Sequence, residues 1–235
     1  MSDTILIIPA FNEESNIAGV IEKLKNHHPD LDYIIIDDGS SDDTAKICKE
    51  RGYHILSLSV NLGLAGAFQT GMRYAYEKGY LFAVQFDGDG QHRAEYVHSM
   101  RERSARGYDI VIASRFVEER KPFSMRMIGS RLISFAIFLT TGARLGDPTS
   151  GMRLYNRKAM EEFALNINYA PEPDTISYLL KQGMKISEVQ ARMDEREGGT
   201  SYLTPLRSIN YMFRMLSSIL LIQNFRKRNA KYRAR

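Results

Sequence analysis

The strongest constraint on the fold is an alternation of short apolar runs with segments of helical periodicity over the first 113 residues. Four runs are rich in β-branched or aromatic side chains, at residues 5–8, 33–36, 80–86 and 109–113. Such runs are typical of strands buried on both faces of a sheet. Between them, apolar side chains recur at helical spacing, as in residues 17–24 and 65–75. This order predicts an α/β fold with a mostly parallel, Rossmann-like sheet and flanking helices.

The second half of the chain has a different pattern. Residues 124–141 predict an amphipathic helix, and we expect its apolar face to carry Met127, Ile128, Leu132, Phe135 and Phe138. Further elements are predicted as strands at 152–155 and 185–193 and as helices at 175–182 and 205–225. Because no repeat or low-complexity linker divides the chain, we expect one domain over residues 1–204, followed by a helix and tail over 205–235.

Charge and composition exclude several classes of protein. The net charge is +4, but six of the last ten residues are Lys or Arg, so the body is close to neutral and is not expected to bind nucleic acid. The charge-free apolar stretches at 132–143 and 215–225 are shorter than the ~20 predominantly apolar residues of a spanning helix. The single cysteine, Cys48, excludes an internal disulfide and a cysteine-cluster zinc site, which predicts a reducing, cytoplasmic setting.

Acidic residues follow two of the predicted strands directly. Asp37 and Asp38 follow the run at 33–36, and Asp87 and Asp89 follow the run at 80–86. In open α/β sheets, ligands bind beyond the carboxyl ends of the strands. These acids are therefore candidates for a functional site.

Asp87 and Asp89 form the clearest candidate metal site. Their i, i+2 spacing on an extended chain points both carboxylates the same way. Such a pair can share a hard cation, Mg²⁺ or Mn²⁺, with the phosphates of a substrate, and Gly88 lets the backbone approach a ligand closely. The alternative is a solvated Asp-Gly turn.

The first two strand ends offer polar and aromatic groups for a nucleotide. Asp38 lies before the turn, so helix capping does not explain it, and its carboxylate can accept hydrogen bonds from a base or ribose. After the first strand, Pro9 ends the ladder. Phe11 is either a core residue or a stacking surface for a base, and Glu13 is either a polar contact or a charge at a helix N-terminus.

Seven motifs in order resemble the family 2 glycosyltransferases of the GT-A fold, and in particular the dolichyl- and polyprenyl-phosphate sugar synthases. They cover nearly the whole chain and begin at Pro9 (PAFNEE), Asp37 (DDGSSDDT), Asn61 (NLGLAGA), Asp87 (DGDGQH), Ser114 (SR), Asp147 (DPTSGMR) and Arg196 (REGGTSY). The resemblance implies an inverting enzyme that consumes a UDP-, GDP- or dTDP-linked sugar with a divalent metal, Mg²⁺ or Mn²⁺.

The resemblance also implies roles for individual residues. Arg115 and Arg196 match positions where cations face the pyrophosphate or an acceptor phosphate, and Asp147 and Asp174 are candidates near the sugar or acceptor. The nucleotide-sugar site is implied to contain Pro9, Phe11, Glu13, Asp38, Asp87, Gly88, Gln91 and Arg115, with Asp87 and Asp89 on the metal.

The acceptor is left as two alternatives. The family's lipid-phosphate enzymes usually carry a Lys in the late loop, where this chain has Thr200-Ser201-Tyr202. A polyprenyl phosphate or a growing cell-envelope glycolipid is the preferred acceptor, and a sugar hydroxyl is the alternative. A hydroxyl needs a general base, for which Asp174 is the candidate, whereas a phosphate is already ionised. A sugar-nucleotide nucleotidyltransferase is disfavoured, because a Gly-rich loop with Arg and Lys does not follow the first strand.

The C-terminal segment also has two interpretations. Its helix over 205–225 is either packed on the core, with basic residues complementing the helix dipole, or a peripheral anchor at the inner face of the cell membrane. The helix at 124–141 could share such a surface.

Overall fold

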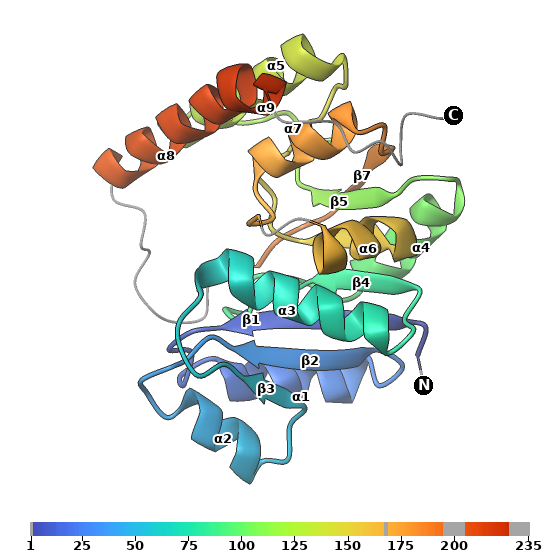
Figure 1. Cartoon of the computed structure of the whole chain (residues 1–235), viewed down its shortest axis with the longest axis vertical. Coiled ribbons are helices and arrows are strands. Elements are labelled where there is room, and N and C mark those ends of the chain that lie inside the picture. The colour runs from blue at the N-terminus through green and yellow to red at the C-terminus, as the bar shows by residue number, and fades with distance from the viewer. Residues whose placement is uncertain (1, 167–168, 195–204, 226–235) are drawn as a thin grey trace.

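A seven-stranded sheet organises the molecule (Figure 1). The computed structural model describes residues 2–166, 169–194 and 205–225. The strand order is β3-β2-β1-β4-β6-β5-β7, and every neighbouring pair is parallel except the two that include β6. The strands are β1 (Thr4–Ala10), β2 (Asp32–Asp37), β3 (Ile55–Ser57), β4 (Phe82–Gln85), β5 (Ile110–Ser114), β6 (Arg153–Asn156) and β7 (Ile186–Gln190). The predicted mostly parallel α/β sheet is confirmed.

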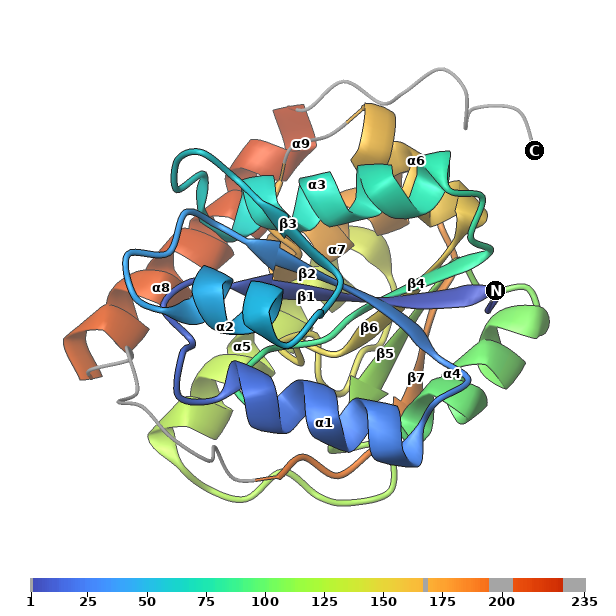
Figure 2. The ribbon, with the colours of Figure 1, turned by 90° about the horizontal axis from the view of Figure 1, so that it is seen from below.

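Helices cover both faces of the sheet because successive side chains of its central strands point to opposite sides. Ile5 and Ile7 of β1 pack in a core with α3 and α6, while Leu6 and Ile8 pack in a second core with α1 and α4. Figure 2 shows these two layers on either side of the strands. The helices of this part of the chain are α1 (Ile17–His27), α2 (Thr44–Glu50), α3 (Gly63–Glu77), α4 (Tyr96–Ala105) and α6 (Arg157–Leu165).

The remaining helices gather at the β7 end of the sheet (Figure 1). They are α5 (Met125–Thr141), α7 (Pro173–Lys181), α8 (Pro205–Ser217), the π-helical turn η1 (Ser218–Ile222) and α9 (Gln223–Phe225). Helices α5 and α8 approach closely at Gly129, where an added Cβ would lie 2.1 Å from the Met212 sulfur. The last predicted helix, over 205–225, is therefore present, with a π turn inside it.

Most of the predicted apolar face of α5 is exposed, and a different set of its apolar side chains is buried. Ile133, Ala136 and Ile137 are buried in the core, whereas Leu132, Phe135 and Phe138 are exposed. The cause is that this helix carries large apolar side chains on both sides, so periodicity alone does not identify the buried one. In the part of the chain that the structure describes, no helix is long and apolar enough to cross a bilayer.

Candidate functional site

The loops after β1, β2 and β4 lie at one edge of the sheet. β1 pairs in parallel with both β2 and β4, so their carboxyl ends meet there. The strand order reverses between β1 and β4, since the chain winds from β1 outward to β3 and then returns to add β4 on the other side. Such a reversal is where open α/β sheets form a ligand crevice.

Asp38 is buried and fixes a neighbouring loop. Its Oδ1 accepts a hydrogen bond of 2.7 Å from the Leu62 backbone N–H at the start of α3. Gly39 has φ of +70°, and a Cβ there would lie 2.9 Å from the Asn61 backbone nitrogen. This turn therefore requires glycine. Asp38 thus lies at the carboxyl edge of the sheet, as predicted, and one of its oxygens already accepts a hydrogen bond from the loop before α3.

Hydrogen bonds join the loop after β1 to the loop after β2. Asn12, with φ of +57°, accepts from the Ser41 N–H at 2.9 Å, and the Asn12 N–H donates to Ser40 Oγ at 3.0 Å. The Glu13 N–H donates to Thr44 Oγ1. Phe11 is 43% exposed beside these contacts, so its ring is accessible to a ligand.

The loop after β4 presents Asp87 and Asp89. The Asp87 side chain is 39% exposed, and Asp89 Oδ1 accepts from the Gln91 N–H at 3.1 Å. Gly90 has φ of +82°, which favours glycine at that turn. A Cβ at Gly88 would lie 3.6 Å from the Pro9 carbonyl oxygen, an ordinary contact, so packing alone does not require this glycine.

The donor set of this loop fits a divalent cation that is shared with a diphosphate. Within the described ranges, no group of three or more His, Cys, Asp or Glu side chains is placed to hold a metal by itself. Mg²⁺ typically binds one or two carboxylates and takes its other ligands from water and substrate phosphates. Two aspartates at the crevice supply that number of carboxylates.

Arg115 and Asp147 form a bidentate ion pair beyond β5. Arg115 Nε donates to Asp147 Oδ2 at 2.7 Å, and Arg115 Nη2 donates to Oδ1 at 3.1 Å. The Asp147 side chain is 0% exposed and the Arg115 side chain 27%. Glu188 accepts from the Gly146 and Asp147 N–H groups at 2.6 Å each, which fixes the turn. Asp147 therefore orients Arg115, whose guanidinium remains partly accessible.

Lys121 adds a second cation that sequence reasoning missed. Its Nζ donates to Ser130 Oγ at 2.8 Å, and this hydroxyl lies 3.4 Å from Thr149 Oγ1, which donates to Asp147. Burial lowers the pKa of Lys121, and the negative charges of Asp147 and Glu188 oppose this shift. Lys121 lies in a loop without periodicity, and no local signal marks it.

Asp174 and Glu172 face the C-terminal helix. Asp174 Oδ2 accepts from Ser218 Oγ at 2.7 Å and from Gln223 Nε2 at 3.3 Å. The π turn η1 aligns these two donors five residues apart. Glu172 pairs with Arg214 at 3.2 Å, and burial raises the pKa of Glu172 against the opposing effect of Arg214.

Arg153 is fully buried and was not assigned a role from the sequence. It donates to the backbone carbonyls of Ser150 (2.9 Å), Pro148 (2.8 Å) and Pro171. One guanidinium thus ties the 147–151 turn to the segment before Glu172. Arg196 lies outside the described residues.

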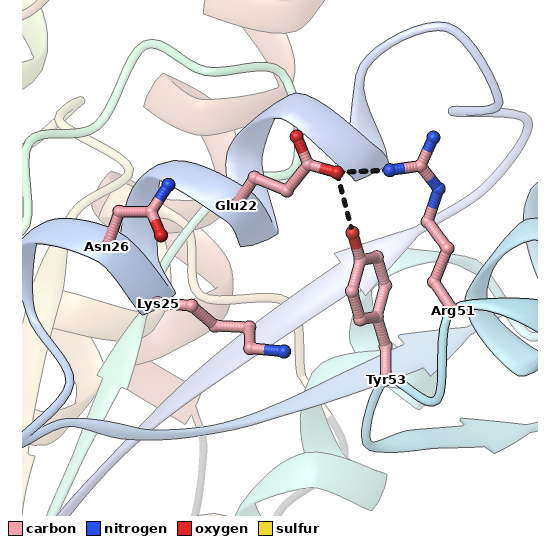
Figure 3. A pocket seen from close by; sticks show the side chains of 5 residues that line it. All are labelled: Glu22, Lys25, Asn26, Arg51 and Tyr53. Atoms are coloured by element: carbon pink, nitrogen blue, oxygen red, sulfur yellow. Dashed lines mark hydrogen bonds and ion pairs between the residues drawn. The ribbon is translucent and has the colours of Figure 1, made fainter.

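A hollow of about 320 Å³ lies elsewhere, between α1 and the chain that leads into β3 (Figure 3). Tyr53 precedes β3, and Glu22 and Lys25 lie in the last half of α1, so the hollow is at the amino ends of the strands. Glu22 accepts from Tyr53 Oη at 3.4 Å and pairs with Arg51. None of the predicted site residues lines this hollow, which is distinct from the crevice.

Comparison with known proteins agrees with this arrangement. Residues 5–163 match the family model described as Glycosyl transferase family 2. The chain is 30% identical to an undecaprenyl-phosphate mannosyltransferase from Micrococcus luteus, over 85% of this chain and 87% of that protein. It is 26% identical to a polyprenol monophosphomannose synthase from Mycolicibacterium smegmatis, over 90% and 85% of the two chains.

A solved structure shows the same fold. The crystal structure of glucosyl-3-phosphoglycerate synthase from Mycobacterium tuberculosis, in complex with Mn²⁺, UDP and phosphoglyceric acid, superposes with a TM-score of 0.67. It is 19% identical and covers 95% of this chain and 79% of its own. With the family model matching more than half of its residues, the chain belongs to glycosyl transferase family 2 and is a glycosyltransferase of the GT-A fold.

Proposed function

We propose that this enzyme transfers a sugar, with inversion, from a nucleotide-diphosphate sugar to a lipid-linked acceptor. The observation that carries the proposal is the position of Asp87 and Asp89 directly after β4, where the strand order reverses. The curated relatives support the acceptor class, because their names specify polyprenol and undecaprenyl-phosphate sugar transfer.

The donor nucleotide binds over the first two strand ends. The exposed ring of Phe11 stacks on the base, and Asp38, Glu13 and Pro9 border the ribose and base. Hydrogen bonds between the loops after β1 and β2 hold this surface in place before the donor arrives. This order lowers the conformational entropy that is lost when the donor binds. The neighbouring structure with UDP supports a uridine donor as the first to be tested.

The diphosphate lies toward the loop after β4. Asp87 and Asp89, with Gln91 and Gly88 beside them, hold a Mg²⁺ or Mn²⁺ ion that neutralises charge on the diphosphate. The neighbour's complexes with Mn²⁺ and with Mg²⁺ support this use of a metal. Arg115, oriented by Asp147, adds a guanidinium for the developing phosphate charge. The family resemblance implies the same role for Arg196.

In the transfer step, an acceptor oxygen attacks the anomeric carbon from the face opposite the diphosphate. A new carbon–oxygen bond forms, the bond from the anomeric carbon to the β-phosphate oxygen breaks, and its electron pair leaves with the nucleoside diphosphate. A phosphate acceptor is already ionised and needs no base, and Arg115 and Lys121 lie together to bind it. For a hydroxyl acceptor, Asp174 is the candidate base.

The hydrogen bonds of Asp174 favour the phosphate acceptor. Two donors from the C-terminal helix already occupy one of its oxygens, and Thr175 N–H donates to the other at 2.8 Å. Both Asp174 oxygens therefore accept hydrogen bonds from groups of this chain, which hold the carboxylate toward the C-terminal helix.

The acceptor's lipid places this enzyme at a membrane surface. Two neighbouring helical segments, α5 and α8–α9, expose large apolar side chains, at Leu132, Phe135, Leu139, Ile209, Phe213, Leu221 and Phe225. Arg131, Arg144 and Arg214 are exposed on the same elements or next to them. Apolar side chains flanked by cations bind anionic bilayers peripherally. We therefore propose that α5 and α8–α9 rest on the cytoplasmic face of the membrane.

The test is product analysis with the full-length protein. Radiolabelled UDP-, GDP- and dTDP-sugars are supplied with Mn²⁺ and either undecaprenyl phosphate in detergent or a soluble sugar acceptor. We expect one donor to give a labelled, acid-labile, lipid-extractable product. Label that moves only to the soluble sugar would overturn the lipid-phosphate acceptor and establish the hydroxyl alternative. With either acceptor, Asp174→Asn should block transfer to a hydroxyl and leave transfer to a phosphate unchanged.

A further inference from the structure

We propose that His92 is a positioning residue for the metal site, whose ring holds the Asp87 carboxylate in the orientation that binds the cation. The inference rests on the proposed function, because it takes Asp87 as a metal ligand. It assigns to His92 a role behind that ligand rather than on the metal itself.

The ring of His92 contacts Asp87 at two points. The Asp87 backbone N–H donates to His92 Nδ1 at 2.8 Å, and His92 Nε2 lies 3.4 Å from Asp87 Oδ2. Because Nδ1 accepts a hydrogen bond, this geometry assigns the ring proton to Nε2, which faces the carboxylate. One ring therefore fixes both the backbone and the side chain of the same aspartate.

The ring is itself held in place. The His92 side chain is only 5% exposed, and it stacks edge-on against Phe86, with ring centroids 5.6 Å apart. Gly151 lies beside both residues, because an added Cβ there would be 3.0 Å from Asp87 Oδ2 and 3.2 Å from His92 Nε2. The pair thus packs against a buried aromatic ring and against a glycine that has no side chain.

These contacts exclude His92 as a direct ligand in this arrangement. A histidine binds a metal through an unprotonated ring nitrogen. Here Nδ1 is taken by the Asp87 N–H and Nε2 faces a carboxylate. A carboxylate that follows the last residue of a strand has rotational freedom, and a buried partner that removes this freedom raises metal affinity.

The turn at residues 147–151 links the Asp87 carboxylate to the Arg115–Asp147 ion pair. Gly151 and Asp147 belong to one turn, in which Ser150 Oγ donates to the Ala113 carbonyl at 2.5 Å. Asp147 orients Arg115 at one end, and Gly151 packs on Asp87 and His92 at the other. His92 therefore completes a rigid support that spans both groups facing the diphosphate.

The experiment measures Mn²⁺ affinity directly, by the EPR signal of free Mn²⁺, on full-length protein alone and with UDP or GDP. The first variant is His92→Phe, which keeps the ring and its contact with Phe86 but removes both nitrogens. We expect Mn²⁺ affinity to fall about 10-fold or more, the effect typical of losing a residue that orients a ligand, with Tm within a few degrees of the wild type. His98→Phe is the matched control, because His98 is exposed on α4, and it should bind Mn²⁺ as the wild type does.

Two further variants separate positioning from simple packing. His92→Asn places an amide oxygen near the position of Nδ1, so it can accept from the Asp87 N–H, and we expect it to recover part of the affinity. Gly151→Ala leaves His92 intact but pushes a methyl group against the Asp87–His92 pair, and it should also weaken Mn²⁺ binding. Gly19→Ala, at a site with open space around it, is its control.

The outcomes are distinguishable. Wild-type Mn²⁺ affinity in folded His92→Phe and Gly151→Ala proteins would overturn the role of His92 while leaving the metal site in place. If His92→Phe does not fold, His92→Asn and Gly151→Ala decide the same question. Wild-type protein that binds no Mn²⁺, or an Asp87→Asn variant that binds it normally, would instead refute the proposed metal site and the role of His92 with it.

Discussion

Arg115 and Asp147 form two parallel hydrogen bonds, of 2.7 and 3.1 Å, between loops 32 residues apart in the chain. The carboxylate is fully buried, while the guanidinium reaches the surface. The acid is therefore enclosed by the protein, whereas the guanidinium that it orients remains partly accessible from outside. Asp147 also accepts from Thr149, so its oxygens are well satisfied as long as Arg115 is present.

Removing Arg115 should destabilise the protein. Arg115→Ala leaves a buried carboxylate without its counter-ion, and we expect a loss of about 3 kcal/mol in the free energy of unfolding. Urea denaturation measures this loss. Arg73→Ala breaks the exposed Arg73–Glu77 pair and should cost less than about 1 kcal/mol. Equal losses in the two variants would contradict the structural importance of the buried pair.

Arg153→Lys should be poorly tolerated despite conserving the charge. Three carbonyls from two segments surround the guanidinium, and one ammonium group on a flexible stem cannot reach all three. We expect a loss of about 2 kcal/mol from unsatisfied buried carbonyls, together with slower transfer, because the turn that holds Asp147 loosens. Arg157→Lys, whose hydrogen bonds lie on the α3–α6 side, serves as the control and should leave transfer unchanged. An Arg153→Lys protein with normal stability would show that the three contacts are not energetically important.

Glu172 should make stability depend on pH. Burial raises its folded-state pKa above the unfolded value of 4.5, so the folded protein binds the proton more tightly. Its contribution is therefore fully present below pH 4.5 and is lost as pH rises through the raised pKa. Glu172→Gln should remove this fall. The check is the difference in unfolding free energy between wild type and variant from pH 4 to 8, and a difference independent of pH would contradict the prediction.

Membrane binding should depend on the exposed face of α5. Phe135→Ser with Leu139→Ser removes two large apolar side chains that are 61% and 65% exposed, so folding should be little affected. We expect at least about 10-fold weaker co-sedimentation with vesicles of anionic phospholipid, from the apolar area no longer inserted. Leu81→Ser and Leu165→Ser, which are exposed on other surfaces, are the controls. Removal of residues 226–235 tests the basic tail separately. Unchanged sedimentation of the α5 variant would place the membrane contact elsewhere.

The strand-end acids could be predicted from the sequence because their signal is local. A buried run followed by aspartates identifies both the strand and the edge where its carboxyl end lies, as for Asp38 and Asp87. The antiparallel direction of β6 could not be predicted, since the residues of a four-residue strand carry no sign of its direction in the sheet. Strand β3 has only three residues, and α4 buries only Val97, Met100 and Ser104, so neither has a strong periodic pattern.

The long-range contacts of the site could not be predicted for a different reason. The partners of Arg115 and Asp174 are set by how separate segments meet in space, as in the contact between Asp174 and Ser218, 44 residues apart. Lys121 and Arg153 carry no local sign of burial. Asp147 and Asp174 were predicted to lie near the sugar or acceptor, and their contacts with Arg115 and with Ser218 of the C-terminal helix had no signal in the sequence.

The proposed transfer depends most on the two aspartates after β4, and its most direct measurement is metal-dependent transfer by Asp89→Asn beside the wild type. Initial rates are taken across a Mn²⁺ titration with the donor identified by product analysis, and Tm is recorded for both proteins. We predict that EDTA abolishes wild-type transfer and that Asp89→Asn stays at least about 100-fold slower at saturating Mn²⁺ with an unchanged Tm, because charge stabilisation by the metal is worth several kcal/mol. Wild-type rates from a folded Asp89→Asn protein, or transfer that persists in EDTA, would contradict a catalytic metal held by Asp87 and Asp89.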